Sequence, residues 1–135
     1  MKTIIDTCIW SLALRRNEPQ NNPYVNELKE LIKEVRVQFI GPVRQELLSG
    51  IKSKKQFILL KTHLGAYDDF NIEKQDYELA AEYFNSARKK GIQGSNTDFL
   101  ICAISTRHHM PILTTDKDFS NFQEVFPVKL HSPRV

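Results

Sequence analysis

The sequence predicts one α/β domain over residues 1–135, with a mostly parallel sheet flanked by helices. Three observations carry this prediction. Thr3–Ile5 is a short apolar strand, as expected for a strand buried on both faces of a parallel sheet. Tyr24–Glu34 has apolar residues at helical spacing, which indicates an amphipathic helix. Further apolar strands and helical segments alternate along the chain, which is typical of α/β folds.

The first half of the chain alternates predicted strands and helices. Gly41 and Pro42 end the second strand, and proline favours the first turn of the helix that carries Glu46. The other predicted elements are, in order, the strand Thr3–Ile5, the helix Thr7–Arg15, the polar turn Asn17–Pro23, the helix Tyr24–Glu34, the strand Arg36–Ile40 and the helix Ile51–Leu64.

The second half contains a helix whose middle, Phe99–Ile104, is apolar on every side, so we expect it to be buried. The predicted elements are the connector Ala66–Ile72, the helix Lys74–Lys90, the loop Gly91–Ser95, the helix Thr97–His109, the strand Pro111–Thr114, a turn or short helix at Phe119–Asn121 and a last strand Val128–Leu130.

Composition and charge are those of a soluble globular protein, with 41% hydrophobic and 26% charged residues and a net charge of +3. This mildly basic surface would tolerate a polyanionic partner. Cys8 and Cys102 lie in apolar stretches without a Cys-x-x-Cys motif, so we expect two buried, reduced thiols in a cytoplasmic protein. We expect no signal peptide and no membrane partner, because no segment has the required apolar length.

Carboxylates follow predicted strands or begin predicted helices in four separate segments. Asp6 follows the first strand, Glu46 lies on the helix after the second, Asp98 begins the apolar helix, and Asp116 and Asp118 follow a later strand. Such positions converge at the carboxyl edge of an open α/β sheet. Carboxylates gathered there repel one another unless a hard divalent cation such as Mg²⁺ binds them. The sequence therefore predicts a metal site at this edge.

Each carboxylate also has a local explanation. Asp6 can cap a helix, and Asp98 suits the positive end of a helix dipole. Glu46 can be a solvated helix residue, and Asp116 and Asp118 are common in turns. Their shared position at one edge of the predicted sheet favours the metal site over four separate local roles.

Four segments of the chain, Ile4–Thr7, Glu46–Gly50, Thr97–Ala103 and Leu113–Phe119, occur in a particular order and spacing. In this respect the chain resembles the PIN-domain nucleases, and more closely the VapC-type toxin ribonucleases of toxin–antitoxin systems. The resemblance spans essentially the whole chain. It implies a single PIN-like domain with a mostly parallel sheet, a homodimer, and a small antitoxin protein that covers the acidic pocket. One departure is Cys8, where the family often carries a small polar residue.

The same resemblance implies that Asp6, Glu46, Asp98 and Asp116 bind Mg²⁺ or Mn²⁺ and catalyse hydrolysis of RNA phosphodiester bonds. We prefer Asp116 to Asp118 as the ligand because it is nearer the strand end, which leaves Asp118 as a supporting residue or helix cap. Thr7 and Thr114 are expected to support the ligands. Two other functions remain open: a non-catalytic PIN-fold module that binds RNA or protein, and a housekeeping RNA-processing nuclease without an antitoxin.

Basic residues away from the predicted metal site offer contacts for RNA. We expect an RNA path to involve Lys52, Lys54, Lys55, Lys89 and Lys90. The histidines at 63, 108, 109 and 131 lack the His-Glu-x-x-His spacing of a zinc site, so we expect them on the surface. Gly91 to Gly94 has the spacing of a Gly-x-x-Gly loop, but a helix-ending turn explains these glycines better.

Overall fold

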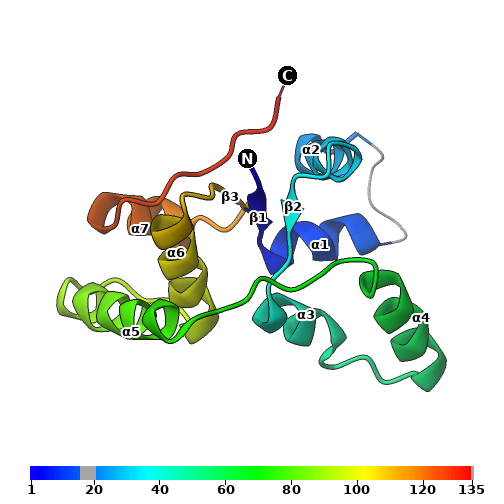
Figure 1. The fold of residues 1–135 in the computed structure, drawn as a ribbon, viewed down its shortest axis with the longest axis horizontal. Coiled ribbons are helices and arrows are strands. Elements are labelled where there is room, and N and C mark those ends of the chain that lie inside the picture. The colour runs from blue at the N-terminus through cyan, green and yellow to red at the C-terminus, as the bar shows by residue number, and fades with distance from the viewer. Residues whose placement is uncertain (16–20, 135) are drawn as a thin grey trace.

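The computed structural model describes residues 1–15 and 21–134, which form three strands and seven helices. In chain order these are β1 (Thr3–Ile5), α1 (Thr7–Leu14), α2 (Pro23–Lys33), β2 (Val37–Gln38), α3 (Gly41–Leu48), α4 (Lys54–Leu64), α5 (Lys74–Lys89), α6 (Asn96–His108), β3 (Ile112–Leu113) and α7 (Asp118–Val125). Figure 1 shows the strands at the centre, with α1 and α2 on one side and α5, α6 and α7 on the other.

The sheet is parallel and has the order β2-β1-β3. Ile4 of β1 pairs with Gln38 on one side and with Ile112 on the other. All three residues of β1 are buried, which explains the apolar character of this strand. The prediction of an α/β fold with a parallel sheet flanked by helices is confirmed.

Two predicted elements of the second half are wrong in extent. The predicted strand Val128–Leu130 contributes only a single bridge, between Leu130 and Ile112, because the chain then turns away towards α2. The predicted turn at Phe119–Asn121 is part of the longer helix α7, whose buried residues Phe119 and Phe122 lie on one face.

Helix boundaries follow local capping. The helix predicted over Ile51–Leu64 begins three residues later in the structure, at Lys54. The reason is that the Ser53 hydroxyl caps α4 by accepting the Gln56 N–H at 3.3 Å. Most of the predicted turn Asn17–Pro23 lies outside the described residues. Within it, Asn22 caps α2 and Pro23 occupies the first turn of that helix.

Helix α6 is the centre of one half of the core, as its apolar sequence predicts. Phe99–Ser105 are all buried, and the Phe99 ring contacts the rings of Phe84, Phe122 and Phe126. A Cβ atom at Gly94 would lie 2.7 Å from the Phe122 ring, so the chain approaches this aromatic cluster too closely for any other residue. The cluster fixes the start of α6, and with it Asp98, beside the strand ends.

The C-terminal segment is held to α2 by ion pairs with the buried carboxylate of Glu27. Arg134 Nε donates to Glu27 Oε1 at 2.8 Å, and His131 Nε2 lies 2.6 Å from Glu27 Oε2. Burial raises the pKa of Glu27, but the hydrogen bonds from Arg134 and His131 outweigh it and lower this pKa to about 2. His131 and His108 are half-buried and paired with carboxylates, so the prediction of four surface histidines is wrong for these two.

No helix of the described chain is both long and apolar enough to cross a membrane.

Candidate metal centre

Asp6 lies at the end of the central strand and is only 6% exposed. Its Oδ1 accepts the Thr7 N–H at 2.8 Å, so it caps α1. Its Oδ2 accepts the Thr114 hydroxyl at 2.8 Å. The main chain links the same two segments, because the Asp6 N–H donates to Leu113 O at 3.0 Å. These bonds fix the Asp6 carboxylate between β1 and the residues that follow β3.

Asp98 is the third residue of α6 and forms a capping box with Ser95. Its Oδ2 accepts the Ser95 N–H at 3.0 Å, and its own N–H donates to the Ser95 hydroxyl at 3.1 Å. The spacing Ser-x-x-Asp is therefore a local device that orients this carboxylate at the helix start. The local role and the candidate ligand role coincide in one side chain.

Glu46 reaches the site from α3, which packs against α1. The Thr7 hydroxyl lies 3.4 Å from Glu46 Oε1, so the predicted supporting residue Thr7 does contact a predicted ligand. The helix itself is anchored two residues earlier. Arg44 donates to both oxygens of Asp69 and to the carbonyls of Leu64 and Tyr67, which ties α3 to the segment after α4.

Asp116 and Asp118 both lie at this site. Each contributes an oxygen to a cluster with Asp98 in which the oxygens lie within 4.8 Å of one another. Asp116 accepts the Asp118 N–H at 2.9 Å, and its own N–H donates to the Thr114 hydroxyl at 3.0 Å. The preference for Asp116 over Asp118 as ligand stays a prediction, because the geometry brings a carboxylate oxygen from each.

The electrostatics of the site are those of an uncompensated anionic cluster. Burial is the main cause that raises the pKa of Asp6, Asp98 and Glu46, and their mutual repulsion, with that of Asp116, raises it further. No ion pair between described residues includes any of these four carboxylates. Carboxylates that are oriented by hydrogen bonds and lack a cationic partner among the described residues form a donor set that suits a hard divalent cation. The residues present therefore fit such an ion.

The surroundings of the site include Cys8, which contacts the predicted supporting residue Thr114 and also Thr115. Cys8 is half-buried rather than buried, and its Sγ lies 3.6 Å from Asp6 Oδ2, 3.5 Å from Thr114 Oγ1 and 3.3 Å from Thr115 Oγ1. The thiol therefore keeps a polar contact with the site at the position where it departs from the resembled family. The prediction of a buried thiol holds for Cys102 and is wrong for Cys8.

The five predicted RNA-contacting lysines are exposed and belong to two separate regions. One group precedes and begins α4, and the other ends α5. These helices lie on opposite sides of Figure 1. None of the five is among the described residues that line the clefts around the carboxylates.

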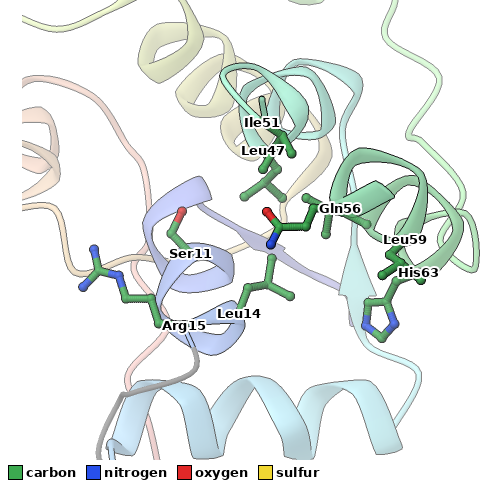
Figure 2. Close-up of a pocket in the computed structure, with 9 residues that line it drawn as sticks. Ser11, Leu14, Arg15, Leu47, Ile51, Gln56, Leu59 and His63 are labelled. Carbon is green, nitrogen blue, oxygen red and sulfur yellow. The ribbon is translucent and has the colours of Figure 1, made fainter. Parts of the chain in front are cut away.

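A groove of about 680 Å³ lies between α1, the end of α3 and α4. Figure 2 shows Leu14, Leu47 and Gln56 pointing into this space, with Arg15 and His63 towards its margins. Leu14 and Leu59 are exposed although apolar. Among the described lining residues none is acidic. The groove is distinct from the carboxylate site but shares helix α1, whose first residue follows Asp6.

The comparison with protein families decides the relationship of this chain. Residues 3–125 match the family model described as the PIN domain. The chain belongs to the PIN domain family. The carboxylate cluster of this PIN domain is formed by the same segments on which the sequence resemblance rests. No curated protein sequence matches the chain.

Solved structures show the same fold. VapBC2 from Rickettsia felis, bound to a DNA fragment from its promoter, has a TM-score of 0.76 at 22% identity, covering 97% of this chain and 98% of that chain. FitAcB from Neisseria gonorrhoeae has a TM-score of 0.73 at 22% identity, covering 97% of both chains. VapBC from Salmonella typhimurium, bound to DNA, has a TM-score of 0.71 at 16% identity, covering 97% of both chains. At these identities the likeness establishes the fold of the PIN domain.

Proposed function

We propose that this PIN domain is a Mg²⁺- or Mn²⁺-dependent endoribonuclease and the toxin of a type II toxin–antitoxin pair. The observation that carries the proposal is the convergence of Asp6, Glu46, Asp98 and Asp116 from four separate segments, without a cationic partner among the described residues. A module that only binds RNA or protein has no use for such a cluster, because it repels the phosphates of RNA and lowers the stability of the metal-free fold.

The residues of the site have distinct tasks in this proposal. Thr7 and Thr114 hold the Asp6 carboxylate, and the capping box holds Asp98, so both ligands are oriented before substrate arrives. Asp6, Glu46, Asp98 and Asp116 would hold a divalent cation, which would supply polarisation of a phosphodiester oxygen and a lower pKa of a water molecule. One of the carboxylates accepts the proton of the attacking water. The reaction needs no 2′-hydroxyl, so preference for RNA follows from access to single strands.

The deciding test is cleavage of total cellular RNA after expression of the wild type and of Asp6→Asn. The amide preserves the volume of the side chain and an acceptor for the Thr7 N–H, while it removes one charge. We expect the wild type to cut RNA at defined sites only with Mg²⁺ or Mn²⁺, and Asp6→Asn to cut at none. Absence of metal-dependent cleavage by the folded wild type would favour the non-catalytic module.

The apolar groove of Figure 2 is the surface that we assign to the antitoxin. A toxin–antitoxin complex from Klebsiella pneumoniae has the same fold, and an aliphatic groove without acidic lining suits an apolar, acidic segment of such a partner. The chain is expected to act as a homodimer in this complex.

Leu59→Asp should leave cleavage intact and abolish neutralisation by a co-expressed antitoxin, with exposed Lys61→Asp as the control on the same helix. Growth that is unaffected by the active wild type would favour a housekeeping nuclease.

A further inference from the structure

A second, smaller groove lies where α3, α5 and α6 meet, in the lower half of Figure 1. It encloses about 300 Å³, and Pro42, Tyr77, Ala80, Ala81, Asn96, Thr97 and Leu100 line it. The Tyr77 side chain is 54% exposed, and it is the one aromatic residue among the large exposed apolar side chains of the described chain. The Tyr77 ring lies beside Ala80 and Ala81 in the lining of this groove and is open to contact from solvent.

This groove adjoins a cleft that contains Glu46 of the carboxylate site. A neighbouring cleft of about 360 Å³ is lined by Pro42, Gln45, Glu46, Ser49 and Thr97. The two share Pro42 and Thr97, so they adjoin at these residues. Thr97 is adjacent to Asp98 in α6 and lines the same cleft as Glu46. A chain whose phosphate is held at the carboxylates can therefore place a neighbouring group in the groove.

The chemistry of the lining selects that group. No charged side chain is among the described residues that line the groove, so a phosphate gains nothing there. Its apolar walls, the Tyr77 ring and the Asn96 amide together suit a flat, neutral ring with polar edges. Unpaired bases stack on aromatic side chains and pair with amides in this way. Lys74 lies three residues before Tyr77, hence on the same face of α5, where it can contact the flanking phosphate.

We propose that this groove, defined by Tyr77 and Asn96, binds an unpaired nucleobase of single-stranded RNA next to the phosphate held at the carboxylates. The proposal rests on the proposed nuclease function. Tyr77 provides the stacking surface and Asn96 reads the edge of the base. The groove thereby excludes duplex RNA, whose bases are stacked and paired and cannot enter.

The test measures binding of a short fluorescent single-stranded RNA with Mg²⁺ in an Asp6→Asn background, which keeps the other carboxylates and is expected not to cleave RNA. Tyr77→Ala should weaken binding about tenfold, while Tyr77→Phe, which keeps the ring, should bind within about twofold of the Asp6→Asn parent. Ala81→Leu, a substitution at an exposed helix position where leucine has a helix propensity close to that of alanine, should fill the groove and weaken binding similarly. Gln75→Ala is the matched control, because it lies on another face of α5 and should change nothing. Duplex RNA of the same sequence should bind all variants equally.

Equal RNA binding by the Asp6→Asn parent and by its Tyr77→Ala and Ala81→Leu variants would overturn the proposal, provided that the variants melt like the parent. Light scattering after gel filtration is a second test. A change from dimer to monomer in Tyr77→Ala would show that the groove binds a second copy of the chain, and this result would also overturn the proposal. Cleavage with Mg²⁺ is scored separately on the wild type. Its absence would refute the nuclease function alone, whereas cleavage with unaltered binding by the Tyr77 variants would refute the base site alone.

Discussion

Asp76 and Asp98 occupy the same local position in two neighbouring helices and end in opposite electrostatic states. Each is the third residue of its helix and forms a capping box, with Glu73 in α5 and with Ser95 in α6. Asp76 is fully buried, and Arg107 Nη1 lies 2.5 Å and His108 Nε2 2.9 Å from its Oδ1. Asp98 has no ion pair within the described chain and faces Asp116 and Asp118 instead.

The pKa values of the two aspartates express this difference. Burial raises the pKa of both. For Asp76 the backbone hydrogen bond from Glu73 and the hydrogen bonds from Arg107 and His108 outweigh burial, so its pKa is lowered. For Asp98 burial prevails over its bonds with Ser95, and repulsion by Asp6 and Asp116 adds to it, so its pKa is raised. A carboxylate whose partners satisfy it stabilises the fold, whereas one left anionic among anions is available for a ligand.

The largest expected effect separates the two aspartates by activity. Asp98→Asn should lower RNA cleavage by more than about 100-fold, because it removes a proposed metal ligand. Asp76→Asn should leave cleavage by the folded protein within a few-fold of the wild type. The measurement is initial cleavage rate with Mg²⁺ at a temperature where both variants are folded. Similar losses in both would end the distinction between a structural and a functional capping box.

Stability should separate them in the opposite sense. Asp76→Asn leaves Arg107 and His108 without their buried partner and should lower the free energy of unfolding by about 2–3 kcal/mol. Asp98→Asn relieves repulsion and should leave the metal-free protein as stable as the wild type or more stable. Urea denaturation in EDTA measures both values, and marked destabilisation by Asp98→Asn would contradict the comparison.

The pH dependence of these differences should have opposite signs. The ordinary pKa of both groups is 3.8. Because the pKa of Asp76 is lowered on folding, its stabilisation is complete above pH 3.8 and is lost as the pH falls through the lowered value. The pKa of Asp98 is raised on folding, so its charged form destabilises the metal-free protein above the raised value. The free energy of unfolding of the metal-free wild type should therefore increase relative to that of Asp98→Asn as the pH falls through the raised value towards 3.8. Denaturation curves from pH 7 to pH 3 therefore distinguish the two substitutions. The same pH dependence of the stability change in Asp76→Asn and Asp98→Asn would contradict this expectation.

A smaller effect is expected from the metal itself. Mg²⁺ or Mn²⁺ at ten times its dissociation constant should stabilise the wild type by about 1.4 kcal/mol and raise its melting temperature. Asp98→Asn should show a weaker response at the same concentration, and Asp76→Asn the full response from its lower starting point. An equal response in all three proteins would place the bound ion away from the carboxylate cluster.

The smallest effect concerns the exposed lysines, whose charges lie outside both aspartate sites. Neutralising Lys52, Lys54 and Lys55 in one variant, and Lys89 and Lys90 in another, should weaken RNA binding in EDTA for all sequences alike. Each lysine that contacts a phosphate should reduce the slope of log affinity against log salt by about 0.7. A variant with unchanged affinity and slope has only solvated lysines at that position. Carboxylate substitutions should change turnover more than this binding.

Much of the fold was readable because it depends on neighbours in the chain. The apolar run of β1, the helical spacing of α2 and the apolar middle of α6 identified these elements, and Pro42 marked the start of α3. One of the boundaries that failed depended on distant contacts. Leu130 forms one bridge instead of a strand because the segment after it is drawn to Glu27, more than 100 residues away in sequence.

The sequence by itself determined which carboxylates begin helices or end strands, since hydrogen bonds to a helix start involve residues only three positions away. On that basis Asp98 stood out and Asp76 did not, although both form the same local structure. Only the tertiary structure decided their states, by placing Arg107 and His108 beside Asp76 and other carboxylates beside Asp98. The physical reason is that a pKa depends on burial and on charges in space, and neither burial nor such charges can be read from the residues next in sequence.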